Sequence, residues 1–268
     1  MQNLGKHNLL GVGIDALDYE AATAKIVDAA RNQLGLAVSA LAVHGLMTGV
    51  ADKVHRYRLN RLDIVTPDGQ PIRWALNLLY RTKLLDRVYG PVLTAKVCEQ
   101  AARQGLPVFF YGSKQETLER LAHNVKERFP GLIVAGYEPS KFRRTTPQEK
   151  AEIAQRIRSS GAKVTFVGLG CPRQEVFAFE YRDALGMPVI AVGAAFDYHA
   201  GLASEPPLWM QRAGLQWFHR LLQDPRRLWR RYIILNTSFL LLLTLQALRV
   251  WHPSLDAAVE PASDMLYG

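Results

Sequence analysis

The segment that decides the fold runs from residue 164 to residue 175 and reads VTFVGLGCPRQE. Its first four residues are β-branched or apolar, which is typical of a buried strand. Gly168 and Gly170 interrupt this run, and Pro172 stands where a helix can begin. A strand, a glycine turn and a helix in this order indicate an α/β protein, in which ligands bind at the carboxyl ends of the strands.

The same alternation of strand and helix patterns extends over most of the chain. We therefore expect an α/β, Rossmann-like fold with a mainly parallel sheet flanked by helices, in two pseudo-lobes that share a cleft. The expected strands are residues 9–14, 37–43, 63–66, 107–111, 132–135, 164–167 and 189–192. The expected helices are residues 18–31, 69–79, 91–104, 114–129, 146–159 and 172–185. Thr146, Pro147 and Glu149 predict a capped helix start.

The composition is that of a globular protein, with 49% hydrophobic and 21% charged residues among 268. The two cysteines, Cys98 and Cys171, show no CxxC or Cys/His spacing, so their spacing indicates neither a disulfide framework nor a zinc site. The first twenty residues have too short an apolar run for a secretory signal, which predicts a cytoplasmic protein.

Positive charge is concentrated late in the chain. The formal net charge is +9, and residues 212–231 contain six arginines and a single acid, Asp224. Because the composition changes after residue 202, we expect a catalytic core over residues 1–202 and a helical, membrane-docking appendage over residues 203–268. Asp224 and Pro225 predict the start of a helix. Residues 233–248 are mostly apolar but shorter than the roughly 20 residues a membrane span needs. We favour a helix in the membrane interface, and burial in a homo-oligomer contact stays open.

Four expected strand-to-helix turns carry candidate ligand-binding residues. Asp68 follows the strand at residues 63–66, where it is either a catalytic carboxylate or simply a helix N-cap. The other three turns combine glycines, which allow close backbone approach to a phosphate, with polar or aromatic side chains. The candidates in these turns are Gly112, Ser113, Gly168, Gly170, Pro172, Gln174, Gly193, Phe196 and Asp197.

In order along the chain, these motifs resemble the WecG/TagA/CpsF glycosyltransferases. The resemblance covers about nine tenths of the sequence, and its long arginine- and tryptophan-rich string is the most specific part. The motifs are TPDG (66–69), YGS (111–113), VGLGCPRQE (167–175), VGAAFDYHAG (192–201), PPLWMQRAGLQWFHRLLQDPRRLWRRY (206–232) and LNTSFLLLL (235–243).

The resemblance implies an inverting, metal-independent enzyme without a cofactor, peripheral on the inner face of the cell membrane. Such enzymes move a sugar from a UDP-sugar to a polyprenyl-diphosphate-linked saccharide in the synthesis of cell-surface polysaccharides. It implies that Asp68 is the general base and that Arg220, Arg227 and Arg230 hold the diphosphate. The sequence agrees with metal independence, since no Asp-x-Asp motif, which could hold a diphosphate-bound divalent ion, follows an expected strand. An anionic membrane surface, and not nucleic acid, is the expected partner of the other arginines.

Two departures from the family pattern leave the donor sugar open. Residues 40–42 read ALA where members that use N-acetylmannosamine carry Thr-x-Asn, and residues 205–207 read EPP where an Arg-Ala-Pro is common. A UDP-hexose and a UDP-N-acetylmannosamine donor are both consistent with the loss of two polar side chains. His44 stands nearby and either replaces them or is only a packed or solvated residue, the commoner role of a lone histidine at a strand end. The competing functions are an NAD-linked oxidoreductase, which the missing GxGxxG disfavours, and a non-enzymatic nucleotide-binding membrane adaptor.

Overall fold

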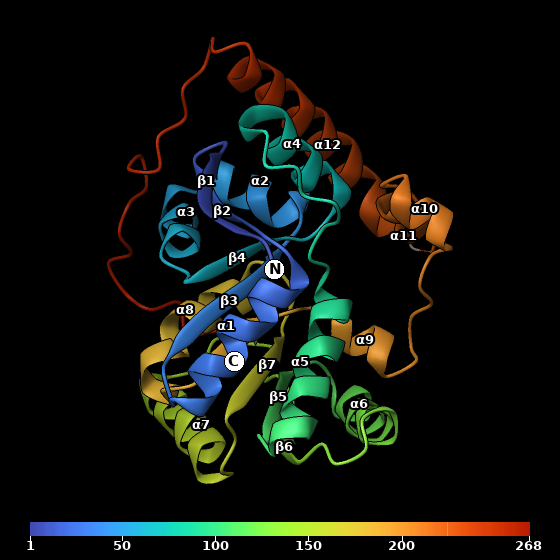
Figure 1. The fold of residues 1–268 in the computed structure, drawn as a ribbon. Helices are drawn as coiled ribbons and strands as arrows, with labels where there is room; N and C mark the ends of the chain where they lie inside the picture. The colour runs from blue at the N-terminus through green and yellow to red at the C-terminus, as the bar shows by residue number, and fades with distance from the viewer. Residues whose placement is uncertain (224) are drawn as a thin grey trace.

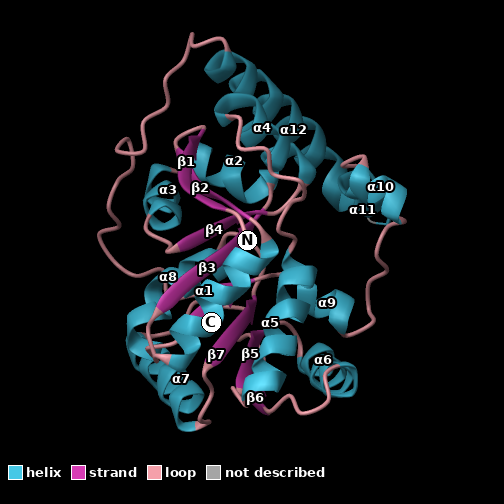
Figure 2. Cartoon of the chain, viewed as in Figure 1, coloured by secondary structure: helices cyan, strands magenta, loops and turns pink. Residues whose placement is uncertain are grey.

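Within residues 1–223 and 225–268, which the structure describes, the chain forms a parallel sheet of six strands in a computed structural model (Figure 1, Figure 2). The strand order is β4-β3-β8-β7-β5-β6, and all neighbours are parallel. The strands are β3 (Leu36–Leu41), β4 (Ile64–Pro67), β5 (Val108–Gly112), β6 (Val134–Glu138), β7 (Val164–Gly168) and β8 (Pro188–Ala191). The predicted α/β class is confirmed.

Helices cover both faces of this sheet because alternate strand residues point to opposite sides. Phe110 and Tyr111, for example, are both buried but belong to different hydrophobic clusters. Helices α1 (Tyr19–Arg31), α5 (Gly90–Gln104), α6 (Gln115–Arg128) and α9 (Ala195–His199) cover the Phe110 face. Helices α2 (Val43–Ala51), α3 (Lys53–Asn60), α4 (Gln70–Tyr80), α7 (Pro147–Ser159) and α8 (Arg173–Leu185) cover the other. The capping box predicted at Thr146 is confirmed, with Glu149 as its partner.

The predicted strand over residues 9–14 is wrong, because this stretch contains the turn of an antiparallel hairpin. The hairpin consists of β1 (Asn3–Leu9) and β2 (Val12–Leu17), and Leu10 and Gly11 turn the chain with φ of 55° and 88°. Residues on both sides of the turn are buried, so the apolar run does not reveal where the strand ends. The hairpin packs beside β4, where Asp15 Oδ2 accepts from the backbone N–H of Val65 at 2.7 Å.

Helices α2 and α3 were not expected, and the strand predicted to end at residue 43 ends at Leu41. Two glycines weaken the helical signal of α2 because glycine is a poor helix former. The fold needs both: a Cβ at Gly45 would lie 2.5 Å from Leu41 Cδ1, and one at Gly49 would lie 2.6 Å from Leu59 Cδ1. Close packing therefore outweighs helix propensity here.

The last three helices are α10 (Leu208–Arg212), α11 (Gln216–Gln223) and α12 (Pro225–Ala247). Helix α12 begins at Pro225, as predicted, whereas its expected cap, Asp224, lies outside the described residues. Phe239 and Leu243 of α12 are buried in the same cluster as the core, and α12 lies along α2 and α4 (Figure 1). Among the described residues, no helix has both the length and the apolar character that a bilayer crossing requires. The domain division at residue 202 stays a prediction.

Beyond α12 the chain runs back along the core without regular structure (Figure 2). Hydrogen bonds fix it at intervals, and it reaches the far end of the sheet, where Ser140 Oγ donates to the carbonyl of Gly268 at 2.8 Å. Further attachments include those that join Asn8 to Pro253, Lys53 to Val259, Lys150 to Asp264 and Glu180 to Met265. This segment was not foreseen from the sequence.

Candidate active site

The strand order places the candidate turns at one edge of the sheet. Strand β3 lies between β4 and β8, and β7 lies between β8 and β5, so the turns after β4, β8, β7 and β5 follow one another along the carboxyl edge. The chain leaves β4 and returns on the far side of β8, which makes this region the point where the topology switches direction. Open parallel sheets bind their ligands at such a point.

Asp68 stands at this edge, directly after β4. Its backbone N–H donates to the carbonyl of Leu41 at 3.2 Å, and its Oδ2 accepts from the backbone N–H of Gly90 at 3.1 Å. Gly90 is the first residue of α5, so the carboxylate lies at a helix N-terminus, where the exposed N–H groups attract an anion. The interpretation of Asp68 as the N-cap of α4 is wrong, because Gly69 with φ 125° holds that position.

Side chains that the sequence did not single out surround Asp68. The Tyr19 hydroxyl accepts from the N–H of Tyr89 at 2.9 Å, and burial raises the pKa of this hydroxyl. The buried Arg87 guanidinium lies 4.2 Å from the centroid of the Tyr89 ring and donates to Gln211 Oε1 at 3.2 Å. Because Gln211 belongs to α10, Arg87 connects the surroundings of Asp68 to the C-terminal helices.

The segment between α10 and α11 packs against α4, the helix that follows Asp68. A Cβ at Gly214, between α10 and α11, would lie 2.8 Å from Trp74 Cη2 and 3.2 Å from Gln70 Cβ. Gln70 and Trp74 belong to α4, whose first residue is two positions after Asp68. The backbone that continues into α11 therefore starts beside the first turns of α4.

The three arginines predicted to bind the diphosphate lie on these helices. Arg220 is on α11, and Arg227 and Arg230 are on α12, three residues apart. The side chains of Leu208, Arg220, Gln223, Arg227, Leu228, Arg230, Arg231 and Tyr232 lie outside the described part of the structure. Their predicted role stays a prediction.

The glycine turns after β5, β7 and β8 lie close to one another. A Cβ at Gly112 would lie 2.9 Å from the carbonyl carbon and oxygen of Gly168, and one at Gly168 would lie 2.5 Å from the Phe196 ring. A Cβ at Gly193 would lie 2.8 Å from Gln174 Oε1. Gly170, with φ 75°, has open space where its side chain would be. These contacts bring together five of the predicted residues, namely Gly112, Gly168, Gln174, Gly193 and Phe196. The turn stays accessible on the side of Gly170.

The remaining predicted donor residues lie around these glycines. Ser113 has φ 60° and its carbonyl accepts from the N–H of Ser140 at 3.1 Å. Pro172 is the N-cap of α8. Phe196 is 1% exposed and packs edge-on against Phe110, so its ring shapes the turn from inside the core. The carbonyl of Asp197 accepts from the N–H groups of Leu202 and Ala203, while its side chain is half-buried.

A buried polar group lies beneath the turn after β7. Glu175 is 1% exposed, and its Oε1 accepts from Gln174 Nε2 at 2.9 Å and from Ser39 Oγ at 3.3 Å. Burial raises the pKa of this carboxyl, and the hydrogen bonds offset part of the shift. His55, 3% exposed, faces the same group, and burial lowers the pKa of its ring to about 4. The sequence did not reveal this group, because its members lie far apart along the chain, in β3, α3 and α8.

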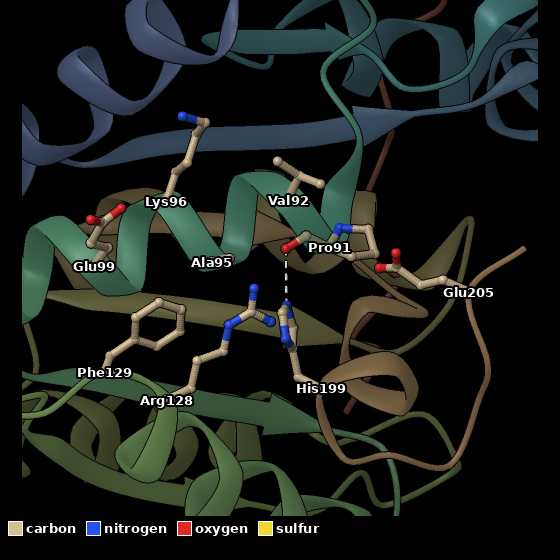
Figure 3. Close-up of a pocket in the computed structure, with 9 residues that line it drawn as sticks. All are labelled: Pro91, Val92, Ala95, Lys96, Glu99, Arg128, Phe129, His199 and Glu205. Carbon is tan, nitrogen blue, oxygen red and sulfur yellow. Dashed lines mark hydrogen bonds between the residues drawn. The ribbon is translucent and has the colours of Figure 1, made fainter. Parts of the chain in front are cut away.

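A surface cavity of about 300 Å³ lies next to the first turn of α5, against α6 and α9 (Figure 3). His199 there bonds through Nε2 to the carbonyl of Pro91 at 2.9 Å, and burial lowers the pKa of its ring. The cavity mixes Lys96 and Arg128 with acidic side chains and is lined by none of the predicted site residues. The carboxyl edge of the sheet, with its converging glycine turns and Asp68, is the better candidate for the active site.

Gly168→Ala tests whether the glycine turns shape the donor site. The added methyl group would overlap the Phe196 ring, and relieving that overlap costs about 1–3 kcal/mol of stability. We expect a lower melting temperature and at least tenfold weaker UDP binding, measured by calorimetry at a temperature where the variant is folded. Gly105→Ala is the control for lost stability alone, because an alanine is strained at its φ of 62° although its Cβ would meet open space far from the turn. Unchanged UDP affinity in Gly168→Ala would place the nucleotide elsewhere.

A parallel sheet whose carboxyl edge carries converging glycine turns and a carboxylate defines an α/β protein whose ligand site is expected at that edge. The comparisons with known proteins specify it further: the chain belongs to the glycosyl transferase WecG/TagA/CpsF family, which matches residues 7–253. The resemblance that the sequence motifs indicated is thereby confirmed.

Two curated relatives carry the same name, N-acetylglucosaminyldiphosphoundecaprenol N-acetyl-beta-D-mannosaminyltransferase. The protein of Bacillus spizizenii is 31% identical over 176 residues, which are 65% of this chain and 66% of the relative. The protein of Bacillus subtilis is 26% identical over 202 residues, which are 75% of this chain and 76% of the relative. The first match thus spans slightly less than two thirds of that relative.

Proposed function

We propose that this chain is an inverting glycosyltransferase that moves a sugar from a UDP-sugar to a polyprenyl-diphosphate-linked saccharide, at the cytoplasmic face of the membrane. The observation that carries the proposal is the position of Asp68, at the carboxyl edge of the sheet and directly before α4, the helix against which the segment leading into α11 packs. The relatives' name supports the acceptor class, since it specifies a sugar on diphosphoundecaprenol. The product would enter a bacterial cell-surface polysaccharide.

The chemistry follows from a carboxylate and a set of arginines. Asp68 accepts the proton of the acceptor hydroxyl as its oxygen attacks the anomeric carbon, and the bond to UDP breaks in the same displacement. One in-line displacement inverts the anomeric centre and needs no enzyme nucleophile. UDP leaves with the bonding electrons, and Arg220, Arg227 and Arg230 stabilise its charge through bidentate hydrogen bonds in place of a divalent ion.

The donor sugar depends on the space beside Asp68. Ala40 lies in β3 next to Thr66 of β4, and its Cβ would be 3.5 Å from a Cβ at Gly90. Polar side chains at positions 40 and 42 would therefore lie near Asp68, and the alanines here remove their hydrogen bonds. His44 lies in the first turn of α2, at the same edge. UDP-hexose and UDP-N-acetylmannosamine donors are the two to compare.

The direct test is to incubate the purified chain with a panel of UDP-sugars and a short-chain polyprenyl-diphosphate N-acetylglucosamine, without added Mg²⁺ or Mn²⁺. We expect a glycosylated lipid by mass spectrometry together with stoichiometric release of UDP. A thermal-shift comparison of UDP, NAD and an oligonucleotide separates the competing functions, because a ligand that binds the native state raises its stability. Stabilisation by NAD or by the oligonucleotide, and not by UDP, would reject the proposal.

The exposed side of the C-terminal helices supports membrane docking. Leu240 and Leu241 are each 60% exposed, next to the buried Phe239. Trp209 and Trp229 are also exposed, and tryptophan favours the headgroup region of a bilayer. The arginines of this region would attract anionic lipids.

Exchanging Leu240 and Leu241 together for serine should release the protein from anionic liposomes in a flotation assay. Since both side chains face outward, the melting temperature and the transfer to a water-soluble acceptor should stay near the wild-type values. Phe239→Ser is the contrasting variant: it replaces a buried ring and should lower the stability by about 3–5 kcal/mol. Undiminished liposome binding by the double variant would exclude this surface as the docking site.

A further inference from the structure

The buried polar group beneath the turn after β7 combines three side chains with metal-binding atoms. His55 of α3, Cys171 of the turn and Glu175 of α8 each direct one such atom to a common point, and these atoms all lie within 4.8 Å of one another. His55 and Glu175 are buried, and Cys171 is half-buried. Figure 1 shows α3 and α8 as neighbours in the layer behind the sheet.

The hydrogen bonds of this group leave donor atoms unused. Both ring nitrogens of His55, and Glu175 Oε2, are buried without a hydrogen-bond partner among the described residues. A buried polar atom without a partner costs about 1–3 kcal/mol, and several of them in one place call for a ligand. Glu175 Oε1, by contrast, is held by Gln174 and Ser39, which orients the carboxylate.

We propose that His55, Cys171 and Glu175 bind one zinc-type divalent cation. The set of one imidazole, one thiolate and one carboxylate suits Zn²⁺, whereas Mg²⁺ and Ca²⁺ prefer oxygen ligands alone. The cation binds the thiol and the carboxyl as anions, so binding releases their protons to solvent. Three protein ligands leave one coordination position, for a water molecule.

The three ligand atoms need to move only slightly to bind a zinc ion. Ligand atoms around a tetrahedral zinc ion lie about 3.5 Å apart, so the three atoms must move inward by on the order of 1 Å. Rotation of the half-buried Cys171 side chain can supply most of this movement, and its partial exposure gives the ion a way in. Gln174 and Ser39 would act as the outer shell that fixes the carboxylate.

A bound ion would fix the position of the turn after β7. The ion would connect α3 to the residues that flank Pro172, and so would hold the turn that carries Gly168, Gly170 and Gln174. None of its three ligands is a residue proposed to hold the diphosphate or to take the proton, and the ion supplies no metal to the proposed transfer reaction. Its presence or absence is independent of the proposed glycosyltransferase function.

The test uses cobalt as a spectroscopic substitute for zinc on the full-length chain without a histidine tag, after removal of metal with a chelator. We expect one equivalent of Co²⁺ to bind and to produce the near-ultraviolet absorption of a cobalt–thiolate bond. The chain has two cysteines, which gives a matched pair of variants. Cys171→Ala should abolish the band, and Cys98→Ala should retain it.

Two further measurements complete the test. His55→Ala should bind Co²⁺ roughly a hundredfold more weakly or worse, whereas His123→Ala, at an exposed position, should bind normally. Zn²⁺ should raise the melting temperature of the wild type and not that of Cys171→Ala. No cobalt–thiolate band in the wild type, or a band that persists in Cys171→Ala, would overturn the proposal. Because Cys171 is half-buried, its variant tests the site even if His55→Ala does not fold.

Discussion

Asp68→Asn should lower the turnover number by about a hundredfold or more, the usual loss when a general base is removed, and should leave the affinity for UDP unchanged. Asparagine retains a side-chain oxygen that can accept the hydrogen bond from Gly90, so the turn after β4 should keep its shape. What the variant loses is the ability to take a proton from the acceptor hydroxyl. Turnover is measured by UDP release at saturating donor, and UDP affinity by calorimetry.

The control for this prediction is a second acid in the same region. Asp86 is exposed, accepts from the N–H of Arg87 at 2.8 Å, and interacts electrostatically with Tyr19 as Asp68 does. Asp86→Asn should therefore change the local field while leaving turnover within a few-fold of the wild-type value. Equal losses in the two variants would mean that the negative charge of the region matters, and not proton transfer to Asp68. Near-normal turnover in Asp68→Asn would remove this residue from the mechanism.

Arg227→Ala should reduce transfer by roughly a hundredfold even when the acceptor is water-soluble. A group that stabilises the charge developing on the leaving diphosphate contributes wherever the acceptor resides, and the loss of one such donor typically costs a factor of a hundred to a thousand. Arg230→Ala should behave similarly, because the two residues share a face of α12. The rates are measured with a short-chain acceptor in the absence of lipid.

Arg226 provides the matched control, since it lies on the same helix and is exposed. Arg226→Ala removes the same charge but should change mainly the binding to anionic liposomes. Full activity of Arg227→Ala on the soluble acceptor would assign this arginine to membrane contact alone. Point substitutions are a sharper test than removal of all residues after 202, because a truncation also removes Phe239 and Leu243 from the core.

The sequence predicts much of this fold because its strands and helices carry local signals. The capped start at Thr146, the glycine turn after β7 and the proline at the start of α12 are each encoded within a few residues. The hairpin turn at Leu10 and the helix α2 were missed because burial and close packing, and not local propensity, determine them. Local sequence patterns predict secondary structure least well where tertiary contacts determine it.

The candidate site likewise combines residues that local sequence reveals with contacts that only the fold reveals. Asp68 could be found from its position after an apolar run, but its contact with Gly90, 22 residues later, requires the strand order. Arg87 and His55 gave no recognisable signal, since their partners lie on other elements. The residue types of the site are therefore readable along the chain, whereas their neighbours become known only from the topology.

The hydrogen bonds of Gln246 constrain the order in which parts of the chain can fold. Its side chain accepts from the N–H of Leu10 at 3.0 Å and donates to the carbonyl of Asn8 at 2.9 Å, and thus joins segments separated by 236 and 238 residues. During synthesis the N–H of Leu10 does not meet its Gln246 partner until residue 246 has left the ribosome, whereas the carbonyl of Asn8 also accepts from the Tyr80 hydroxyl. Contacts of such long range form late and slow the final step of folding. With the membrane docking proposed above, the apolar helix that carries Gln246 would meet the folding core and the lipid surface at the same stage, so the two docking events would compete in time.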